Sequence, residues 1–333
     1  MHTYNIYNPF EDFRFDNQTC FLSGQPLLSA GDQIQVFPDW LMRRFDIEDK
    51  PFKLLDESLR TYKALRLPCA PAVAERISEL DKRVRQAFEK GYGAVVDMDR
   101  VTLFQWVSRM VYGVVFNEIQ AGIRQQALSG EAMNFSQVLV HKFKHLHLML
   151  QSLIVPVQFD GLPFSIIVAQ VDNPADTFNY RDEINTLVYS LRMNDFGLIA
   201  CLQDNGANGA YNNAFVEPLT GRRLHPIQFE ELCARFFYSA YLFNRLPTYM
   251  VAPTADQVYI EPMSLMDMSM RPIFDPWQAK TYGQVLENFW KPWGYTLFEI
   301  IKDPENPMSF LLTHEGQPID AAEITLPTGG NHG

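Results

Sequence analysis

The spacing of apolar residues in this chain changes at Pro156, from the period of a helix to the period of a strand. Over 71–90 the apolar residues recur every three or four positions, which places them on one face of a helix. Similar spacing over 102–125 and 134–153 predicts two more helices, and residues 226–242 are predicted to form a helix rich in Phe. Later, residues 185–203 alternate with a period of two and read as a hairpin that turns at Asn194-Asp195. The pattern predicts an α+β fold in which helices pack on a mainly antiparallel sheet.

The length and composition indicate a folded protein with more than one compact part. The chain has 333 residues, of which 47% are hydrophobic and 20% are charged, enough for one large domain or two ordinary ones. We expect a small N-terminal module with an aromatic arm at 1–98, an α+β domain at 99–324 and a flexible tail at 325–333.

The net charge of the chain indicates which class of partner it is expected to bind. The formal net charge is -11, so the field of the protein repels a polyanion unless its cations gather on one face. The basic clusters are short, and solvated helix faces are their ordinary interpretation. They are Arg43-Arg44, Lys82-Arg83-x-Arg85, Lys142 with Lys144, and Arg222-Arg223. A protein partner is therefore favoured over nucleic acid.

The cysteines and the apolar stretches indicate a compartment. The four cysteines are scattered without a Cys-x-x-Cys pair, which favours buried reduced thiols over a disulfide framework. The first residues lack the basic-then-apolar pattern of a signal peptide. The most apolar stretch, 146–157, is broken by polar residues and is too short to cross a bilayer. We expect a cytoplasmic protein without a membrane partner.

One segment, 20–81, suggests a specific chemistry. It opens on Cys20 with Ser23 three positions later, and it closes on Ser78-x-Leu80-Asp81. Between these lie Val36-Phe37-Pro38-Asp39-Trp40-Leu41 and Leu67-Pro68-Cys69-Ala70-Pro71-Ala72-Val73-Ala74.

This segment resembles the HNH-type endonuclease module, a ββα-metal fold, in the branch that carries a structural zinc. In that branch two Cys-x-x-Cys knuckles hold the zinc, and a His before the hydrophobic-Pro-x-Trp-Leu run is the general base. An Asn follows the second knuckle. The whole chain is also similar to a Bacteroidetes-type family of bacterial proteins built on this module, a resemblance that names no activity.

The resemblance covers the framework and omits the reactive groups. Ser23 stands where the second knuckle cysteine belongs, and Ala70 and Val73 stand at the other knuckle, with Cys69 one place off register. Gln35 takes the place of the catalytic His, and Ala74 takes the place of the Asn. The first domain is therefore expected to be a degenerate ββα module without zinc, catalytic residue or cofactor.

A glutamine can still hydrogen-bond a phosphate, although it cannot accept a proton near neutral pH. Residual nucleic-acid contact would fall on Gln35 and on the basic cluster Lys82, Arg83 and Arg85, which lies on the helix that approaches DNA in the family. HNH-type nuclease activity is predicted to be absent.

Three histidines on one predicted helix are the alternative metal site. His141 and His145 have the i, i+4 spacing that suits a shared ion, and His147 follows. The glutamate of a metalloprotease helix is missing between them, so packed or solvated histidines are favoured.

These observations predict a non-catalytic HNH-like protein that acts as a binding or regulatory module. The alternative from another class is an enzyme whose site lies in the C-terminal domain around the 185–203 hairpin, with Arg192, Asp195 and Asp204 as candidates.

Overall fold

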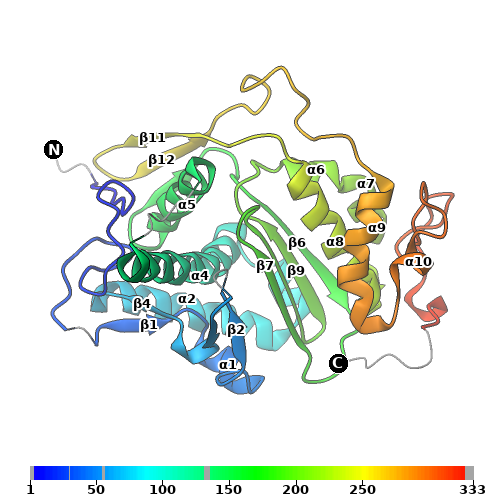
Figure 1. The fold of residues 1–333 in the computed structure, drawn as a ribbon, viewed down its shortest axis with the longest axis horizontal. Helices are drawn as coiled ribbons and strands as arrows, with labels where there is room; N and C mark the ends of the chain where they lie inside the picture. The colour runs from blue at the N-terminus through cyan, green and yellow to red at the C-terminus, as the bar shows by residue number, and fades with distance from the viewer. Residues whose placement is uncertain (1–3, 30, 55–56, 131–135, 327–333) are drawn as a thin grey trace. The chain divides into compact units, whose positions relative to one another are not determined.

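The structure is a computed structural model that describes residues 4–29, 31–54, 57–130 and 136–326 (Figure 1). The chain divides into two compact units, each built from three separate segments. Unit 1 consists of Met1–Ala87, Met98–Pro163 and Leu246–Met263, and unit 2 consists of Phe88–Asp97, Phe164–Arg245 and Ser264–Gly333. This division differs from the single boundary expected near residue 98, because residues 98–163 belong with the N-terminal segment.

The first part of unit 1 is a pair of short strands followed by a long helix. Its elements are β1 (Gln33–Gln35), α1 (Asp39–Arg44), β2 (Pro51–Lys53), β3 (Leu59–Thr61), η1 (Tyr62–Ala64), β4 (Arg66–Pro68) and α2 (Pro71–Lys90). Strand β1 pairs antiparallel with β4, with Ile34 opposite Leu67. Proline suits the first helical position because that residue needs no amide proton there, and α2 begins at Pro71 as its apolar spacing predicts. The elements between β1 and β4 form an insertion with its own small hairpin.

The rest of unit 1 packs two long helices beside a small sheet. Its elements are α4 (Arg100–Ser129), α5 (Gln137–Leu150), η2 (Gln151–Leu153), β5 (Val157–Phe159), β11 (Tyr249–Pro253) and β12 (Val258–Pro262). The Asp99 carboxylate accepts a hydrogen bond from Thr102 N at 2.8 Å and thereby caps the first turn of α4. A Cβ on Gly113 would lie 2.7 Å from Val36 Cγ1, so only glycine lets α4 approach the residue after β1 this closely.

Unit 2 is built on a five-stranded sheet in the order β10-β6-β9-β8-β7. Its strands are β6 (Ser165–Val171), β7 (Phe178–Glu183), β8 (Val188–Met193), β9 (Phe196–Cys201) and β10 (Arg223–Leu224). All neighbours are antiparallel except β10 and β6. The α+β class with a mainly antiparallel sheet is thus confirmed, and so is the hairpin that turns at Asn194-Asp195.

Helix α8 packs on one face of that sheet, and α9 packs on α8, as Figure 1 shows. The helices of unit 2 are α3 (Tyr92–Val96), α6 (Ala207–Tyr211), α7 (Asn213–Val216), η3 (Glu217–Leu219), α8 (Pro226–Leu242), α9 (Ala279–Trp290), η4 (Lys291–Trp293), α10 (Leu297–Ile300) and η5 (Ala321–Glu323). Gly197 of β9 makes room for the sheet-facing ring of α8, because a Cβ there would lie 2.3 Å from Phe229.

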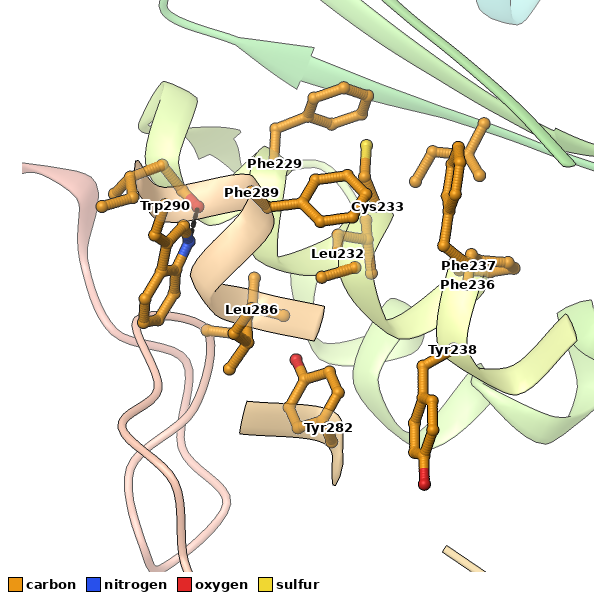
Figure 2. Close-up of a cluster of buried hydrophobic side chains, with 14 of the residues drawn as sticks. Phe229, Leu232, Cys233, Phe236, Phe237, Tyr238, Tyr282, Leu286, Phe289 and Trp290 are labelled. Atoms are coloured by element: carbon orange, nitrogen blue, oxygen red, sulfur yellow. Dashed lines mark hydrogen bonds between the residues drawn. The ribbon is translucent and has the colours of Figure 1, made fainter. Parts of the chain in front are cut away.

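The core of unit 2 is the seam between α8 and α9, shown in Figure 2. Rings and aliphatic side chains from both helices interleave there, and Trp290 Nε1 donates a hydrogen bond to Ile227 O at 3.3 Å. The labelled residues are Phe229, Leu232, Cys233, Phe236, Phe237, Tyr238, Tyr282, Leu286, Phe289 and Trp290. Each large apolar side chain buried in this way contributes about 1.5–3 kcal/mol, so the seam fixes α8 firmly against α9.

From the sequence, the Gly- and Asn-rich residues 204–213 are expected to form a mobile loop, and 295–301 and 309–313 are expected to form strands; the structure differs at all three. Residues 204–213 are not a mobile loop: Asp204 precedes α6 and accepts hydrogen bonds from Ser165 Oγ at 2.6 Å and Asn208 N at 2.8 Å. Residues 295–301 are not a strand, because Thr296 and Glu299 form a capping box that starts α10. The strand expected at 309–313 is only an isolated bridge, Leu312 to Pro318. Most of the tail expected at 325–333 lies outside the described residues.

Candidate functional site

In unit 1, Gln35 lies at the end of β1, and a buried arginine holds its backbone. Arg109 of α4 is 1% exposed and donates from Nη1 to Gln35 O at 3.2 Å. Its Nη2 donates to Asp81 Oδ1 of α2 at 3.0 Å. Burial raises the pKa of Asp81, and the positive charge of Arg109 opposes that rise. One guanidinium therefore joins β1, α2 and α4 around the position that the resemblance assigns to a general base.

The side-chain oxygen of Gln35, which is buried, makes no hydrogen bond to the described residues. Asp81, the last residue of the Ser78-x-Leu80-Asp81 motif, is already bound to Arg109.

The predicted basic cluster lies on α2, with Lys82, Arg83 and Arg85 all exposed. At 100° per residue, Lys82 and Arg85 lie 60° apart around the helix axis, and Arg83 points 100° away from Lys82. Acidic Glu79 and Glu89 are exposed on the same helix. The three cations therefore do not form one stripe.

Three residues at or beside positions that the resemblance assigns to zinc knuckles come together. The Cys20 thiol, 0% exposed, is in hydrogen-bonding contact with the thiol of Cys69 and with Ser23. The bond from Cys69 lowers the pKa of Cys20 to about 5 and raises that of Cys69. Val73, at a knuckle ligand position, is buried at 4% exposure.

The three histidines of α5 each bind a backbone carbonyl. His141 Nε2 lies 2.9 Å from Pro247 O, His145 Nδ1 lies 3.0 Å from His141 O, and His147 Nε2 lies 2.8 Å from Phe21 O. Burial lowers the pKa of both His145 and His147 to about 4. Within the described residues, no group of three or more His, Cys, Asp or Glu side chains could hold a metal ion.

The residues proposed for a C-terminal active site lie in three separate places in unit 2. Arg192 Nε lies 3.4 Å from Glu230 Oε1 on α8, and Asp195 Oδ1 accepts from Tyr92 N of α3 at 2.8 Å. Asp204 serves the start of α6, and burial raises its pKa to about 6. Each side chain is engaged in holding two elements together, and the structure does not bring the three to one site.

Unit 2 contains instead a cavity of about 870 Å³ that was not predicted from the sequence. We call it the Arg235 pocket. It is lined by α6, α7, α8, the beginning of α9 and the segment 305–319. Its aromatic walls are Tyr211, Phe215, Trp277 and Tyr282.

Two charged residues of α8, one turn apart, line the Arg235 pocket. Glu231 is 1% exposed, and its two oxygens accept from Ser309 Oγ at 2.7 Å and Phe310 N at 2.6 Å. Burial raises the pKa of Glu231 to about 7. Arg235 stacks on Phe215, with 3.2 Å from its Cζ to the ring centroid. Its Nε is buried without a hydrogen-bond acceptor among the described residues.

Sequence reasoning missed this site because Glu231 and Arg235 have the i, i+4 spacing of an ordinary surface ion pair. The available signal was their position in the Phe-rich helix 226–242, where an apolar surrounding implies buried charges.

Comparisons with protein-family models, with curated proteins and with solved structures found no match to this chain. Among the described helices, none has the length and apolar character needed to cross a membrane.

Proposed function

We propose that the first part of unit 1 is a catalytically silent HNH-like module and that the protein acts as a binding or regulatory component. A protein partner is the favoured ligand, with nucleic acid second. The proposal rests on Arg109, which holds the backbone of Gln35 and the carboxylate of Asp81.

The framework supports the resemblance. Two antiparallel strands, β1 and β4, are followed by α2, and Cys20, Ser23 and Cys69 lie together as facing knuckles would. This order and grouping fit a module that keeps its packing residues.

Apolar burial can account for the stability that zinc provides in the family. A structural zinc contributes roughly 10–16 kcal/mol to folding, and one large apolar side chain contributes about 1.5–3 kcal/mol. Six such side chains are buried around the knuckle positions, so their sum is of the same order. They are Phe21, Leu22, Val36, Phe37, Leu41 and Val73.

The chemistry of hydrolysis conflicts with the groups present. A nuclease of this type needs a base that activates water and a divalent cation at the scissile phosphate. Gln35 cannot act as a base, and the buried guanidinium of Arg109 at its carbonyl repels a cation placed beside it. Binding without cleavage is the function consistent with both facts.

The charges favour a protein partner. The exposed cations Lys82, Arg83 and Arg85 spread around α2 among acidic residues, and the net charge of the chain is -11. A strong phosphate contact needs cations gathered on one side.

A nuclease assay tests the absence of cleavage. Purified protein is incubated with plasmid and with single-stranded DNA in magnesium, manganese or nickel, beside Gln35→Ala protein. We expect no cleavage by either protein. Metal-dependent cleavage by the wild type that is lost in Gln35→Ala would overturn the proposal.

A mobility-shift titration in salt separates the two ligand classes. We expect weak binding to DNA, and equal binding by wild type and by a Lys82→Gln/Arg83→Gln/Arg85→Gln variant. The matched control is Arg222→Gln/Arg223→Gln in unit 2. Steeply salt-dependent binding that is lost only in the α2 variant would assign nucleic acid as the ligand and reject the protein-partner reading.

A further inference from the structure

The Arg235 pocket has the size and composition of a small-molecule site. Its volume of about 870 Å³ falls within the roughly 300–1,000 Å³ that ligand pockets usually occupy. Four aromatic rings line it together with a few polar side chains, and all of them belong to unit 2.

Arg235 is a cation held in position by aromatic rings. Its Cζ lies 3.2 Å from the Phe215 centroid, 4.8 Å from Trp277 and 5.2 Å from Tyr282. No ion pair joins it to a carboxylate among the described residues, and its Nε is buried without an acceptor. Stacking restricts the guanidinium, so less side-chain freedom is lost when it forms two parallel bonds to an anionic group.

Glu231 attracts Arg235, but its carboxyl is held by hydrogen bonds from another segment. Both of its oxygens already accept hydrogen bonds from Ser309 and Phe310, on the segment that closes one side of the pocket. Burial raises the pKa of Glu231 to about 7, and the positive charge of Arg235 opposes that rise, although the two side chains form no ion pair among the described residues. Glu231 therefore neutralises the positive charge of Arg235 less than their i, i+4 spacing suggests.

Asn212, which also lines this pocket, has a buried oxygen without a hydrogen-bond partner among the described residues. Asn212 is 1% exposed, and its Nδ2 donates to Asn208 O at 3.0 Å and Ser239 Oγ at 2.9 Å. These bonds fix the amide, yet its Oδ1 has no donor within the described residues. A buried acceptor without a partner is unfavourable, and a ligand N–H or O–H would satisfy it.

The mouth of the pocket presents a stacking surface. Tyr211 is 37% exposed. Its ring stacks on Phe274, with 4.2 Å between the centroids and 27° between the planes. The ring of Trp277 lies 6.4 Å from it at 29°. Nearly parallel rings of this kind offer their faces to a third flat ring.

We propose that the Arg235 pocket binds a planar aromatic molecule that carries one anionic group. The anion pairs with Arg235, the ring packs against Tyr211 and Trp277, and a ligand N–H or O–H donates to Asn212 Oδ1. Glu305 and Glu315 also line the pocket, so the local charge favours a single negative charge, as in a carboxylate, over a multiply charged phosphate.

Two pairs of probes test this by titration calorimetry and by tryptophan fluorescence. Indole-3-acetate and its neutral amide form one pair, and adenosine 5′-monophosphate and adenosine form the other. We expect indole-3-acetate to bind about tenfold or more tightly than the amide, the advantage that a charge-assisted hydrogen bond gives. The nucleotide is expected to bind more weakly than indole-3-acetate. The reverse order would overturn the carboxylate assignment.

Variants of the full chain show which residues produce the preference for the anionic probe. Arg235→Gln should abolish the preference for the anion, and Arg235→Lys, which keeps the charge, should retain part of it. Arg222→Gln removes an exposed arginine of the same unit and should change nothing. Tyr211→Leu, at an exposed position, should weaken both indole probes alike.

Two results would overturn the proposal. One is equal binding of indole-3-acetate and its amide, including no binding of either. The other is an anion preference that persists in Arg235→Gln. Near-UV circular dichroism establishes that each variant is folded, and Arg235→Lys with Tyr211→Leu provides the test if Arg235→Gln does not fold.

Discussion

Replacing Arg109 by methionine should destabilise unit 1 strongly, because it leaves a carboxylate without its cation. The Arg109 side chain is 1% exposed and that of Asp81 is 20% exposed, with 3.0 Å between Nη2 and Oδ1. Removing one partner of a fully buried pair costs about 3–5 kcal/mol, and the residual exposure of Asp81 places the expected loss near the lower end, about 3 kcal/mol. The lost bond to Gln35 O adds to that cost.

The magnitude is measured by urea unfolding followed by circular dichroism, in a cycle with Asp81→Leu. We expect the double variant Arg109→Met/Asp81→Leu to be more stable than Arg109→Met alone, because the unpaired charge is gone. Asp81→Asn serves as the matched change that removes charge and keeps shape.

The pH dependence of the free energy of unfolding provides a second test of the Arg109–Asp81 pair. Burial raises the folded pKa of Asp81 above its ordinary 3.8, so the folded state holds more protons than the unfolded state in the window above 3.8. Stability attributable to this carboxyl therefore falls as the pH rises through that window. Arg109→Met removes the opposing charge, so the fall should become larger and extend to higher pH. A loss below about 1 kcal/mol, or a double variant no more stable than Arg109→Met, would refute the reasoning.

Three further predictions concern buried groups. Glu231→Gln should remove a stability loss that the wild type shows as the pH rises from 4.5 to about 7, since burial raises the folded pKa, and melting temperatures at pH 5 and 8 measure the difference. His147→Gln should reduce the loss of stability as the pH falls from 6.5 to about 4, because burial lowers the folded pKa of His147; an unchanged acid-unfolding profile would contradict this. Gly197→Ala should cost roughly 1–3 kcal/mol in urea unfolding because its Cβ would lie 2.3 Å from Phe229, whereas Gly93→Ala in α3 meets nothing within 4 Å and should be neutral or slightly stabilising.

The elements that sequence reasoning predicted well carry their determinants locally. Helices α2 and α8 begin at Pro71 and Pro226 and end where their apolar stripes end, so each boundary is marked by residues inside the helix. The β8–β9 hairpin is equally local, because Asn194 adopts the positive φ that its turn needs.

The elements that sequence reasoning predicted wrongly depend on residues distant in the sequence or on helix caps. The 204–213 segment has the glycine and asparagine content of a loop. Ser165 of β6, which is distant in the sequence, nevertheless donates a hydrogen bond to Asp204 and helps to order the segment. In 295–301 the alternating apolar residues suggest a strand, but the Thr296–Glu299 box fixes a helix. The three-segment construction of each unit is likewise a long-range property that no window of sequence contains.

The same limit explains why α8 could be predicted as a buried helix while its functional side chain could not. Three charges lie on this helix, and only their partners distinguish them. Glu230 binds Asn179, Arg181 and Arg192 on the sheet, and Glu231 binds Ser309 and Phe310 on a segment more than seventy residues later. These two carboxylates are used by the fold. Arg235 stacks on Phe215 but has no carboxylate partner among the described residues, so its charge remains available to a ligand. Arg235 is partly buried, and a partly buried cation without a bound anion is unfavourable, so this side chain is the one of the three expected to gain most from an anionic ligand.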